Sequence, residues 1–321
     1  MNTYNIENAV VELLENCNLK CKHCYGFFNK NNTININDYT NLIKELYKLG
    51  CSQLILSGGE PTLLGNKLFQ YVDITRSVGI NKIILTTNGT IAFKDYKNFT
   101  KFDLIQVSID GKETTHDKIR GIGNYKKAIS FIENLKKNNC NISVMMTVHK
   151  ENYNDLDFLY NFFKNKKILF GIEIATSCGR GNDIESISKD QYYILKNYIQ
   201  DNNISCNDPI AFVENNCFFP YFSKDTLGGC SAGVSSVCIS SQLEIFPCPR
   251  LRLSCGSLTH DNLSSIWSYS KIFNQLRDRD SFTGNCSKCV HLYRCGGCRA
   301  RAYIKNKSII SGDNFCFIND H

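Results

Sequence analysis

The chain has 321 residues, a formal net charge of +7 and 17 cysteines. This length allows about two domains and a large apolar core, so disulfide crosslinks are not needed for stability. No signal peptide and no run of ~18 apolar residues is visible, which indicates a cytoplasmic protein without a membrane span, whose reduced cysteines favour metal binding. The lysines are dispersed and bound thiolates would offset the charge, so nothing favours a nucleic-acid partner.

Short apolar runs alternate with stretches of helical periodicity over roughly the first 180 residues. The runs predict strands at 9–14, 53–57, 82–86, 104–109, 142–148 and 168–174. Helices are expected at 37–49, 67–78, 125–137 and 155–163. This repetition predicts an α/β fold with parallel strands, as a partial (β/α)6 barrel of the TIM type whose chemistry lies on the loops after the strands.

The pattern changes after the sixth predicted strand. A helix is expected at 187–199, a hairpin at 236–239 and 243–246, and one short helix at 263–276. From Cys217 onward the chain is rich in cysteines and loops and poor in apolar residues for a core, which predicts a small domain folded around metal. We therefore expect a barrel over 1–185, a bridging region over 186–225 and a cysteine-rich domain over 226–321.

Three cysteines follow the first predicted strand with the spacing C-x3-C-x2-C, at Cys17, Cys21 and Cys24. Three thiolates in one short loop can hold three irons of a cubane iron–sulfur cluster. The fourth iron is then open to a small molecule. A zinc site is the alternative, with His23 inside the motif as a fourth ligand.

Glycines and polar residues follow the next three strands. Gly58 and Gly59, with Glu60 beside them, come after the second strand, and two glycines let a backbone approach a ligand closely. Asn88 follows the third strand, where an Asn-Gly turn explains it equally well. Ser108 ends the fourth strand, and an Arg-Gly pair stands twelve residues further on.

From residue 9 to about 180, the order and spacing of these motifs resemble the radical S-adenosylmethionine (SAM) superfamily. The resemblance implies that the open iron binds SAM and that an electron from the cluster cleaves its sulfonium, giving a 5′-deoxyadenosyl radical that abstracts hydrogen from a substrate. It implies that Cys17, Cys21 and Cys24 hold the cluster. The SAM contacts that it implies are His23, Gly58, Gly59, Glu60, Asn88, Ser108 and Arg120.

A second cysteine pattern lies near the C-terminus. Paired C-x2-C motifs alone are typical of a zinc ribbon, but seven cysteines exceed one zinc site. The pattern resembles the SPASM extension of radical SAM peptide maturases, which implies two auxiliary 4Fe–4S clusters and three clusters in all. The implied ligands are Cys286, Cys289, Cys295 and Cys316 for the outer cluster, and Cys230, Cys248 and Cys298 for the inner cluster.

Three further features of the second pattern are open. The fourth ligand of the inner cluster is Cys217, Cys238 or Cys255. We favour Cys217, because the extra family ligand usually precedes the Cys230 position. Leu243 stands where the family usually has glycine. Cys178, after the sixth strand, is a candidate catalytic residue that donates a hydrogen to substrate or pairs with it; an ordinary small loop residue is the alternative.

The resemblance implies an oxidoreductase that modifies a ribosomally synthesised peptide by a thioether, C–C or C–O crosslink, or by a related oxidation of a side chain or Cα. Alternatives are an epimerase, an enzyme acting on a haem-like cofactor, and a formylglycine-forming sulfatase maturase. Pro249 disfavours the last, since such maturases are expected to have aspartate at this position. An electron-transfer or metal-sensing protein would not use the Gly-Gly-Glu turn.

The implied partners are a precursor peptide and an electron donor of the flavodoxin or ferredoxin type. The first strand begins close to Met1, which leaves no room before it for a leader-binding domain, so a separate leader-binding protein is a further expectation. The general base is left open among Asp110, Glu173, Asp183 and Tyr221, because geometry must decide before pKa.

Overall fold

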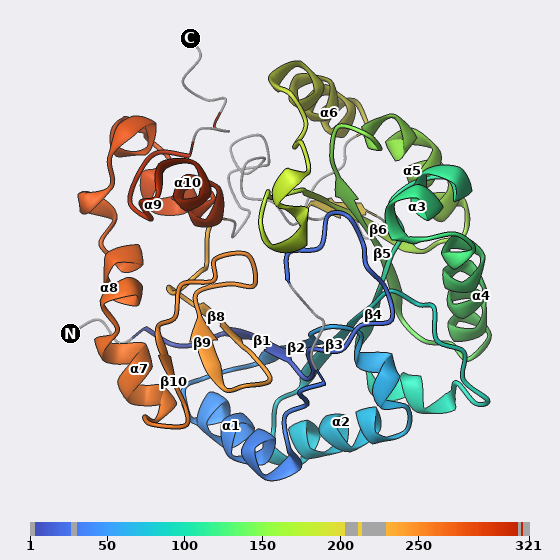
Figure 1. Ribbon diagram of the computed structural model, residues 1–321, viewed down its shortest axis with the longest axis horizontal. Helices are drawn as coiled ribbons and strands as arrows, with labels where there is room; N and C mark the ends of the chain where they lie inside the picture. Colours follow the sequence, from blue (N-terminus) through green and yellow to red (C-terminus); the bar gives the residue numbers. More distant parts are fainter. Residues whose placement is uncertain (1–3, 27–30, 203–210, 214–228, 314–315, 317–321) are drawn as a thin grey trace.

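The computed structural model describes residues 4–26, 31–202, 211–213, 229–313 and 316. In this part of the chain one sheet of ten strands curls into an open barrel (Figure 1). The strand order is β10-β9-β8-β1-β2-β3-β4-β5-β6-β7. The strands are β1 (Asn8–Glu12), β2 (Gln53–Ser57), β3 (Lys82–Thr87), β4 (Leu104–Ser108), β5 (Ile142–Val148), β6 (Leu169–Ile174), β7 (Ala211–Val213), β8 (Ser236–Ile239), β9 (Glu244–Phe246) and β10 (Gly256–Ser257).

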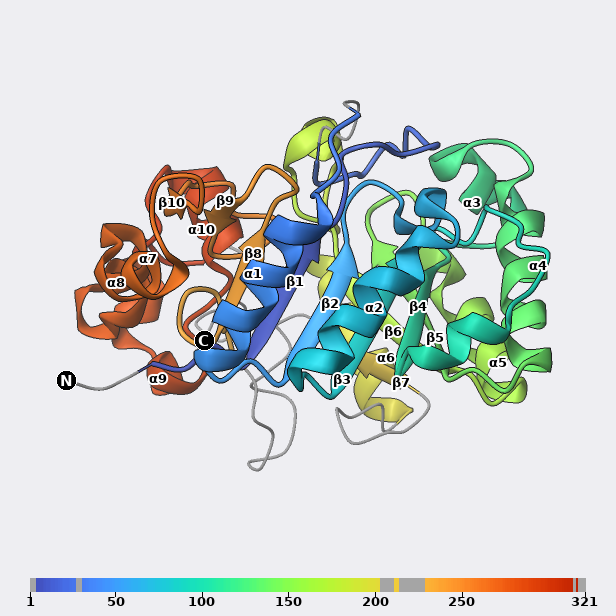
Figure 2. The same ribbon diagram turned by 90° about the horizontal axis from the view of Figure 1, so that it is seen from below.

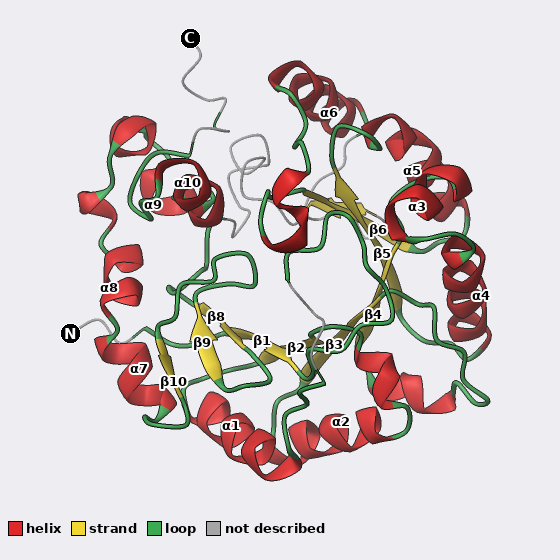
Figure 3. Cartoon of the chain, in the orientation of Figure 1, coloured by secondary structure: helices red, strands yellow, loops and turns green. Residues whose placement is uncertain are grey.

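Apart from the last two, which contribute buried residues to two smaller apolar clusters, helices cover the outside of this sheet (Figures 2 and 3). They are α1 (Ile36–Lys48), α2 (Lys67–Val78), α3 (Glu113–Arg120), α4 (Asn124–Lys137), α5 (Leu156–Asn165), α6 (Lys189–Asp201), α7 (Leu263–Tyr269), α8 (Lys271–Arg277), α9 (Leu292–Cys295) and α10 (Arg299–Asn306). None of the helices in the described ranges is long and apolar enough to cross a membrane. The predicted α/β partial barrel is confirmed, because β1 to β6 pair in parallel and in chain order.

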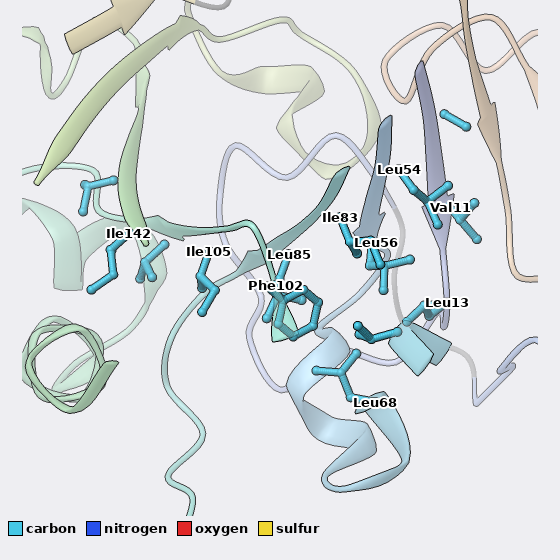
Figure 4. Packing of buried hydrophobic residues seen from close by; sticks show 14 of the residues in the cluster. Val11, Leu13, Leu54, Leu56, Leu68, Ile83, Leu85, Phe102, Ile105 and Ile142 are labelled. Atoms are coloured by element: carbon cyan, nitrogen blue, oxygen red, sulfur yellow. The ribbon is translucent and has the colours of Figure 1, made fainter. Parts of the chain in front are cut away.

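Alternation along the strands separates the core from the inside of the barrel. Leu54 and Leu56 of β2 are fully buried and face the helices, whereas Ile55 between them faces inward. Figure 4 shows the outward layer, where Leu56 and Leu85 lie near Leu68 of α2. The parallel register brings the carboxyl ends of β1 to β6 to one rim, and the loops after them carry the predicted motifs.

The C-terminal part extends the barrel sheet. β8 pairs in parallel with β1 and forms the predicted antiparallel hairpin with β9. Val237, Ile245 and Trp267 belong to the same apolar cluster as the barrel, so much of the core is shared. The boundaries at 185 and 225 stay a prediction.

The single helix expected at 263–276 is wrong. Two helices, α7 and α8, meet at Ser270, whose ψ of 125° is extended. The bend brings Trp267 and Phe273 together with ring centroids 4.8 Å apart, so packing of two large aromatic rings overrides the helical pattern.

Candidate active site

A cavity of about 700 Å³ lies inside the barrel and reaches its carboxyl rim. Inward side chains of the strands, such as Ile55, Ile84 and Gln106, form its wall. Twelve candidate site residues predicted from sequence line it: Cys17, Cys21, His23, Cys24, Gly58, Gly59, Glu60, Asn88, Ser108, Arg120, Glu173 and Cys248. Pro249 and Arg250, from the cysteine-rich part, line it as well. The cavity therefore brings the two cysteine motifs to one space.

The first cysteine group suits an iron–sulfur cluster. Burial raises the pKa of the Cys17 thiol to about 12 and also raises that of Cys21, and neighbouring thiolates add to both effects. Ligation by iron replaces the proton of a thiol, so a buried set of thiols with like-charge repulsion gains from a cluster core. The backbone N–H of Leu19 donates to Cys17 Sγ at 3.4 Å, and Arg120 Nη1 lies 3.9 Å from Cys21 Sγ.

No three His, Cys, Asp or Glu side chains in the described ranges are arranged to hold a single metal ion. A single ion needs tighter grouping than a cubane, whose thiolates each bind a separate iron.

The loop after β2 packs directly against the loop that carries Cys17, Cys21 and Cys24, here called the cysteine loop. The backbone N–H of Gly59 donates to Leu14 O at 2.7 Å, and that of Glu60 donates to Asn16 O at 2.9 Å. A Cβ on Gly59 would lie 1.9 Å from Asn16 O, and Gly58 has a φ of +129°. Both glycines are therefore required by backbone geometry, since no side chain fits between the two loops.

Glu60 is fully buried, and protein groups saturate its carboxylate. Oε1 accepts hydrogen bonds from Thr62 N (3.1 Å), Thr62 Oγ1 (2.5 Å) and Thr87 Oγ1 (2.6 Å), and Oε2 accepts one from Asn88 N (2.7 Å). Burial raises its pKa in spite of these donors. Glu60 thus ties the rim of β2 to that of β3. Gly58 and Gly59 line the cavity together with Glu60.

Asn88 also connects neighbouring loops. Its Oδ1 accepts from Thr90 N at 2.9 Å, as an Asx turn does, while its Nδ2 donates to Asn18 Oδ1 of the cysteine loop at 3.0 Å. The turn and the contact with the cysteine loop are therefore both present.

Asp110, Arg120 and His23 form a buried network beside the cysteines. Arg120 Nε donates to Asp110 Oδ2, and Arg120 Nη2 lies 3.1 Å from His23 Nε2. Burial opposes ionisation of Asp110, but Arg120 outweighs it, so the pKa of Asp110 lies below its usual range. Burial lowers the pKa of His23 to about 4, which makes it neutral. His23 Nδ1 is buried and has no hydrogen-bond partner among the described residues, so it is free for a ligand.

The turn after β6 closes over the same loop. The backbone N–H of Gly181 donates to Cys24 O at 2.9 Å, and a Cβ on Gly179 would lie 2.1 Å from Tyr25 O. Arg180 between them lines the cavity, and its Nη2 lies 3.5 Å from Leu19 O. Cys178 lies near Cys24 and Cys298 electrostatically, but it is not among the described residues that line the cavity.

The C-terminal cysteines gather in two groups. Cys295 is electrostatically close to Cys286 and Cys316, and Cys289 N donates to Cys286 O at 3.2 Å. Cys248 is close to Cys230 and Cys298. The members of each group belong to one of the two ligand sets that the resemblance implies, and their binding of clusters stays a prediction. N–H groups point at several of the sulfurs: Gly297 N to Cys295 (3.4 Å), His291 N to Cys289 (3.4 Å) and Arg299 Nη2 to Cys286 (3.5 Å).

The three candidates for the fourth inner ligand differ in position. Cys238 is fully buried on β8 and electrostatically close to Cys248. Cys255 donates to Leu253 O at 3.6 Å and lies near Arg277 instead. Cys217, the favoured candidate, lies outside the described residues, as does Tyr221. Leu243 adopts a φ of +64°, which explains why glycine suits this position.

Two arginines that the sequence analysis missed anchor the segment 248–252, here called the strap. Arg252 forms an ion pair with Glu12 at the end of β1, and Arg250 forms one with Glu173 of β6. The strap therefore connects the first and last strands of the six-stranded barrel and holds Cys248 at the cavity. In the sequence, two arginines closely follow Cys248, but this pattern does not indicate which carboxylates they pair with.

Comparison with known proteins agrees with this geometry. The family model "Radical SAM superfamily" matches residues 11–163. An AdoMet-dependent heme synthase of Methanosarcina barkeri is 26% identical over 95% of this chain and 94% of its own. The subtilosin biosynthesis protein AlbA of Bacillus subtilis is 26% identical over 94% of this chain and 68% of its own. The crystal structure of Streptococcus suis SuiB bound to precursor peptide SuiA has a TM-score of 0.79 at 18% identity, covering 98% of this chain and 76% of that chain.

These findings match residues 11–163 of the chain to the radical SAM superfamily and give the chain as a whole the fold of SuiB. A radical SAM segment of this kind implies SAM and a 4Fe–4S cluster as cofactors. The buried thiols, the close glycine turn and the free His23 Nδ1 fit such a pair of cofactors.

Proposed function

We propose that this enzyme modifies a ribosomally synthesised peptide, by a thioether, C–C or C–O crosslink or a related oxidation of a side chain or Cα. The observation that carries the proposal is the common cavity, where Cys17, Cys21 and Cys24 face Cys248 across one space. A substrate there would touch both cysteine motifs. AlbA, named for bacteriocin biosynthesis, and SuiB, crystallised with a precursor peptide, support a precursor peptide as the partner.

The residues at the rim bind and orient the cofactors. Cys17, Cys21 and Cys24 hold the first cluster, which together with SAM supplies a 5′-deoxyadenosyl radical when bound. Gly58, Gly59 and Glu60 meet the amino group of SAM. The remaining SAM contacts are His23 as a neutral ring beside the adenine, Asn88 at the rim, and Ser108 with Arg120 at the ribose and carboxylate.

The C-terminal part holds two auxiliary 4Fe–4S clusters in this proposal. The outer ligands are Cys286, Cys289, Cys295 and Cys316, and the inner ligands are Cys230, Cys248 and Cys298 with Cys217 as the fourth. A net oxidation needs an electron acceptor near the substrate, and one of the inner ligands, Cys248, lines the cavity. Electrons for SAM cleavage would come from a flavodoxin or ferredoxin, and a separate protein would hold the leader.

Modification of a haem-like cofactor is the second candidate. The observation that favours it is the AdoMet-dependent heme synthase, which aligns with 95% of this chain. Both candidates use the same cofactors and cavity, so they differ only in substrate.

The test begins with the anaerobically reconstituted, reduced protein and SAM. We expect 5′-deoxyadenosine to form, and about twelve irons per chain if three clusters bind. Cys21→Ala should abolish SAM cleavage. Cys140→Ala, which removes a half-buried thiol far from both groups, should leave it intact. Absence of 5′-deoxyadenosine from the iron-loaded protein would refute a radical SAM activity.

The substrate is then separated by mass spectrometry. Peptides encoded beside the gene and iron porphyrins are supplied in parallel reactions. A SAM-dependent mass change in a peptide supports the first candidate, and a change only in a porphyrin replaces it with the second.

A further inference from the structure

More cationic than acidic side chains line the cavity. Among the described residues that line it, the cations are Lys82, Arg120, Arg180 and Arg250, and the carboxylates are Glu60 and Glu173. Glu60 is saturated by hydrogen bonds, and burial raises its pKa. SAM is itself a net cation, because its sulfonium and amino groups outnumber its carboxylate. Asp110 pairs with Arg120, and bound thiolates add negative charge beside the cysteines, so binding of an anionic second ligand would depend on a single well-placed cation.

Arg250 is the cation best placed for that ligand. Arg120 and Arg180 contact the cysteine loop, through Cys21 Sγ and Leu19 O, and so lie on the SAM side. Arg250 sits on the strap, two residues after Cys248, and lines the cavity. Its side chain is 27% exposed, so the guanidinium is reachable from the cavity yet shielded enough for a strong charge-assisted hydrogen bond.

The guanidinium of Arg250 has unused donors. Its Nη2 donates to Glu173 Oε2, and no described residue accepts from its Nε or Nη1. The other strap arginine differs, because both Nη atoms of Arg252 donate to Glu12, which is 2% exposed. Both terminal nitrogens of Arg252 are thus used by a buried carboxylate, whereas Arg250 has donors left to bind a ligand.

Glu173 is held as a counter-ion for Arg250. Thr147 Oγ1 donates to Glu173 Oε1 at 3.1 Å, which fixes the carboxylate beside the guanidinium. The side chain of Glu173 is 18% exposed. Because water in the cavity can reach this ion pair, an incoming carboxylate can replace Glu173 on Arg250 or bind beside it.

Building on the proposed function, we propose that the substrate carries a carboxylate group that Arg250 binds at the strap side of the cavity. The carboxylate binds one edge of the guanidinium, through Nη2 together with Nη1 or Nε, and displaces Glu173, which takes Nη2 in the free enzyme. An acidic side chain of a peptide and a propionate of a porphyrin share this chemistry. Arg250 is therefore a specificity residue for either substrate class.

The test compares acid and neutral forms of two probes on the cluster-loaded protein with SAM. One pair is iron coproporphyrin III and its tetramethyl ester. The other is a random heptapeptide pool with a central Glu, and the same pool with Gln. We expect the acid form of one pair to bind at least about tenfold more tightly, the effect of one charge-assisted contact. The pair that shows the preference identifies the substrate class.

Variants assign the preference to Arg250. Arg250→Gln should remove it, and Arg250→Lys should reduce it, because the fork is lost while the charge remains. Glu173→Gln should strengthen binding of the acid form, since the competing carboxylate is gone. Arg252→Lys is the matched control and should keep the preference. A merely structural Arg250–Glu173 pair predicts instead that Glu173→Gln leaves the affinity unchanged or weakens it.

The proposal is overturned if the acid and neutral forms bind equally well in both probe pairs. It is also overturned if the Arg250→Gln variant still prefers the acid form. If Arg250→Gln does not fold, the direction of the Glu173→Gln effect decides. SAM cleavage is measured separately in every sample. Intact cleavage without any acid preference refutes the carboxylate site alone, whereas absent cleavage refutes the proposed function.

Discussion

Arg252 and Glu12 form an ion pair between positions 240 residues apart in the chain. Glu12 ends β1 and is 2% exposed, while Arg252 is 30% exposed and covers the ring of Tyr25 with its guanidinium 5.6 Å from the centroid. Tyr25 directly follows Cys24, and its hydroxyl lies 3.4 Å from Glu12 Oε1. One arginine therefore joins the strap, the first strand and the cysteine loop.

Arg252→Met should lower the free energy of unfolding by about 3 kcal/mol, because it leaves a buried carboxylate without its counter-ion. The double variant Glu12→Leu, Arg252→Met should recover part of this loss, since no charge then remains buried. Urea unfolding measures both. Lys150→Met, which breaks the exposed pair with Glu185, is the control and should change stability by no more than about 0.5 kcal/mol. If Arg252→Met and Lys150→Met lowered the free energy of unfolding by similar amounts, burial of the ion pair would not explain its contribution.

Local sequence patterns predicted the six barrel strands and the motif residues in the loops that follow them. Alternating apolar runs are a short-range signal, and the six barrel strands appear within two residues of their expected ends. The motif residues follow those strands, so parallel pairing alone brings Cys17, Gly59 and Arg120 to one cavity.

Long-range partners could not be predicted. Nothing near Arg252 in the sequence indicates Glu12, and nothing near Arg250 indicates Glu173. The pairing of β8 with β1 and the bend at Ser270 likewise depend on packing between distant segments. The missed part of the site is thus the part built from two chain regions.

Gly59→Ala should disturb the cysteine loop, because the added Cβ would lie 1.9 Å from Asn16 O, a backbone atom. We expect a loss of about 2 kcal/mol in stability and a reduced iron content after reconstitution. Iron analysis and thermal unfolding provide the measurement. Gly123→Ala is the control: its φ of +80° and ψ of 0° lie in the left-handed region and nothing lies within 4 Å of an added Cβ, so it should cost only about 1 kcal/mol and keep its iron. Full iron loading of Gly59→Ala would argue against the close approach.

Leu243 offers a test of backbone strain, since its φ of +64° lies in the left-handed region. Leu243→Gly should be more stable than Leu243→Ala by about 1 kcal/mol, because both lose the same packing against the core but only alanine keeps the strain. Thermal unfolding of the two variants measures the difference. The opposite order, with alanine more stable, is expected for an ordinary extended position and would show that the backbone relaxes there.

His116 predicts how stability depends on pH. Its side chain is fully buried in α3, and Nδ1 accepts from Asp110 N at 3.2 Å. Burial lowers the pKa of His116 from 6.5 to about 4, and Arg120 adds to the effect. Between these two values the unfolded chain binds a proton that the folded protein does not. The free energy of unfolding therefore falls as the pH falls through this window.

The measurement compares pH 7.5 with pH 5.5 by urea unfolding, followed through the fluorescence of Trp267, the single tryptophan. His116→Asn keeps an acceptor for Asp110 N but cannot titrate, so its loss between the two pH values should be about 1 kcal/mol smaller than that of the wild type. Comparing pH values within each variant cancels the packing that the substitution removes. His260→Asn, at an exposed position, should behave as the wild type does. An equal loss in His116→Asn and wild type would mean that His116 is protonated with little cost in the folded protein.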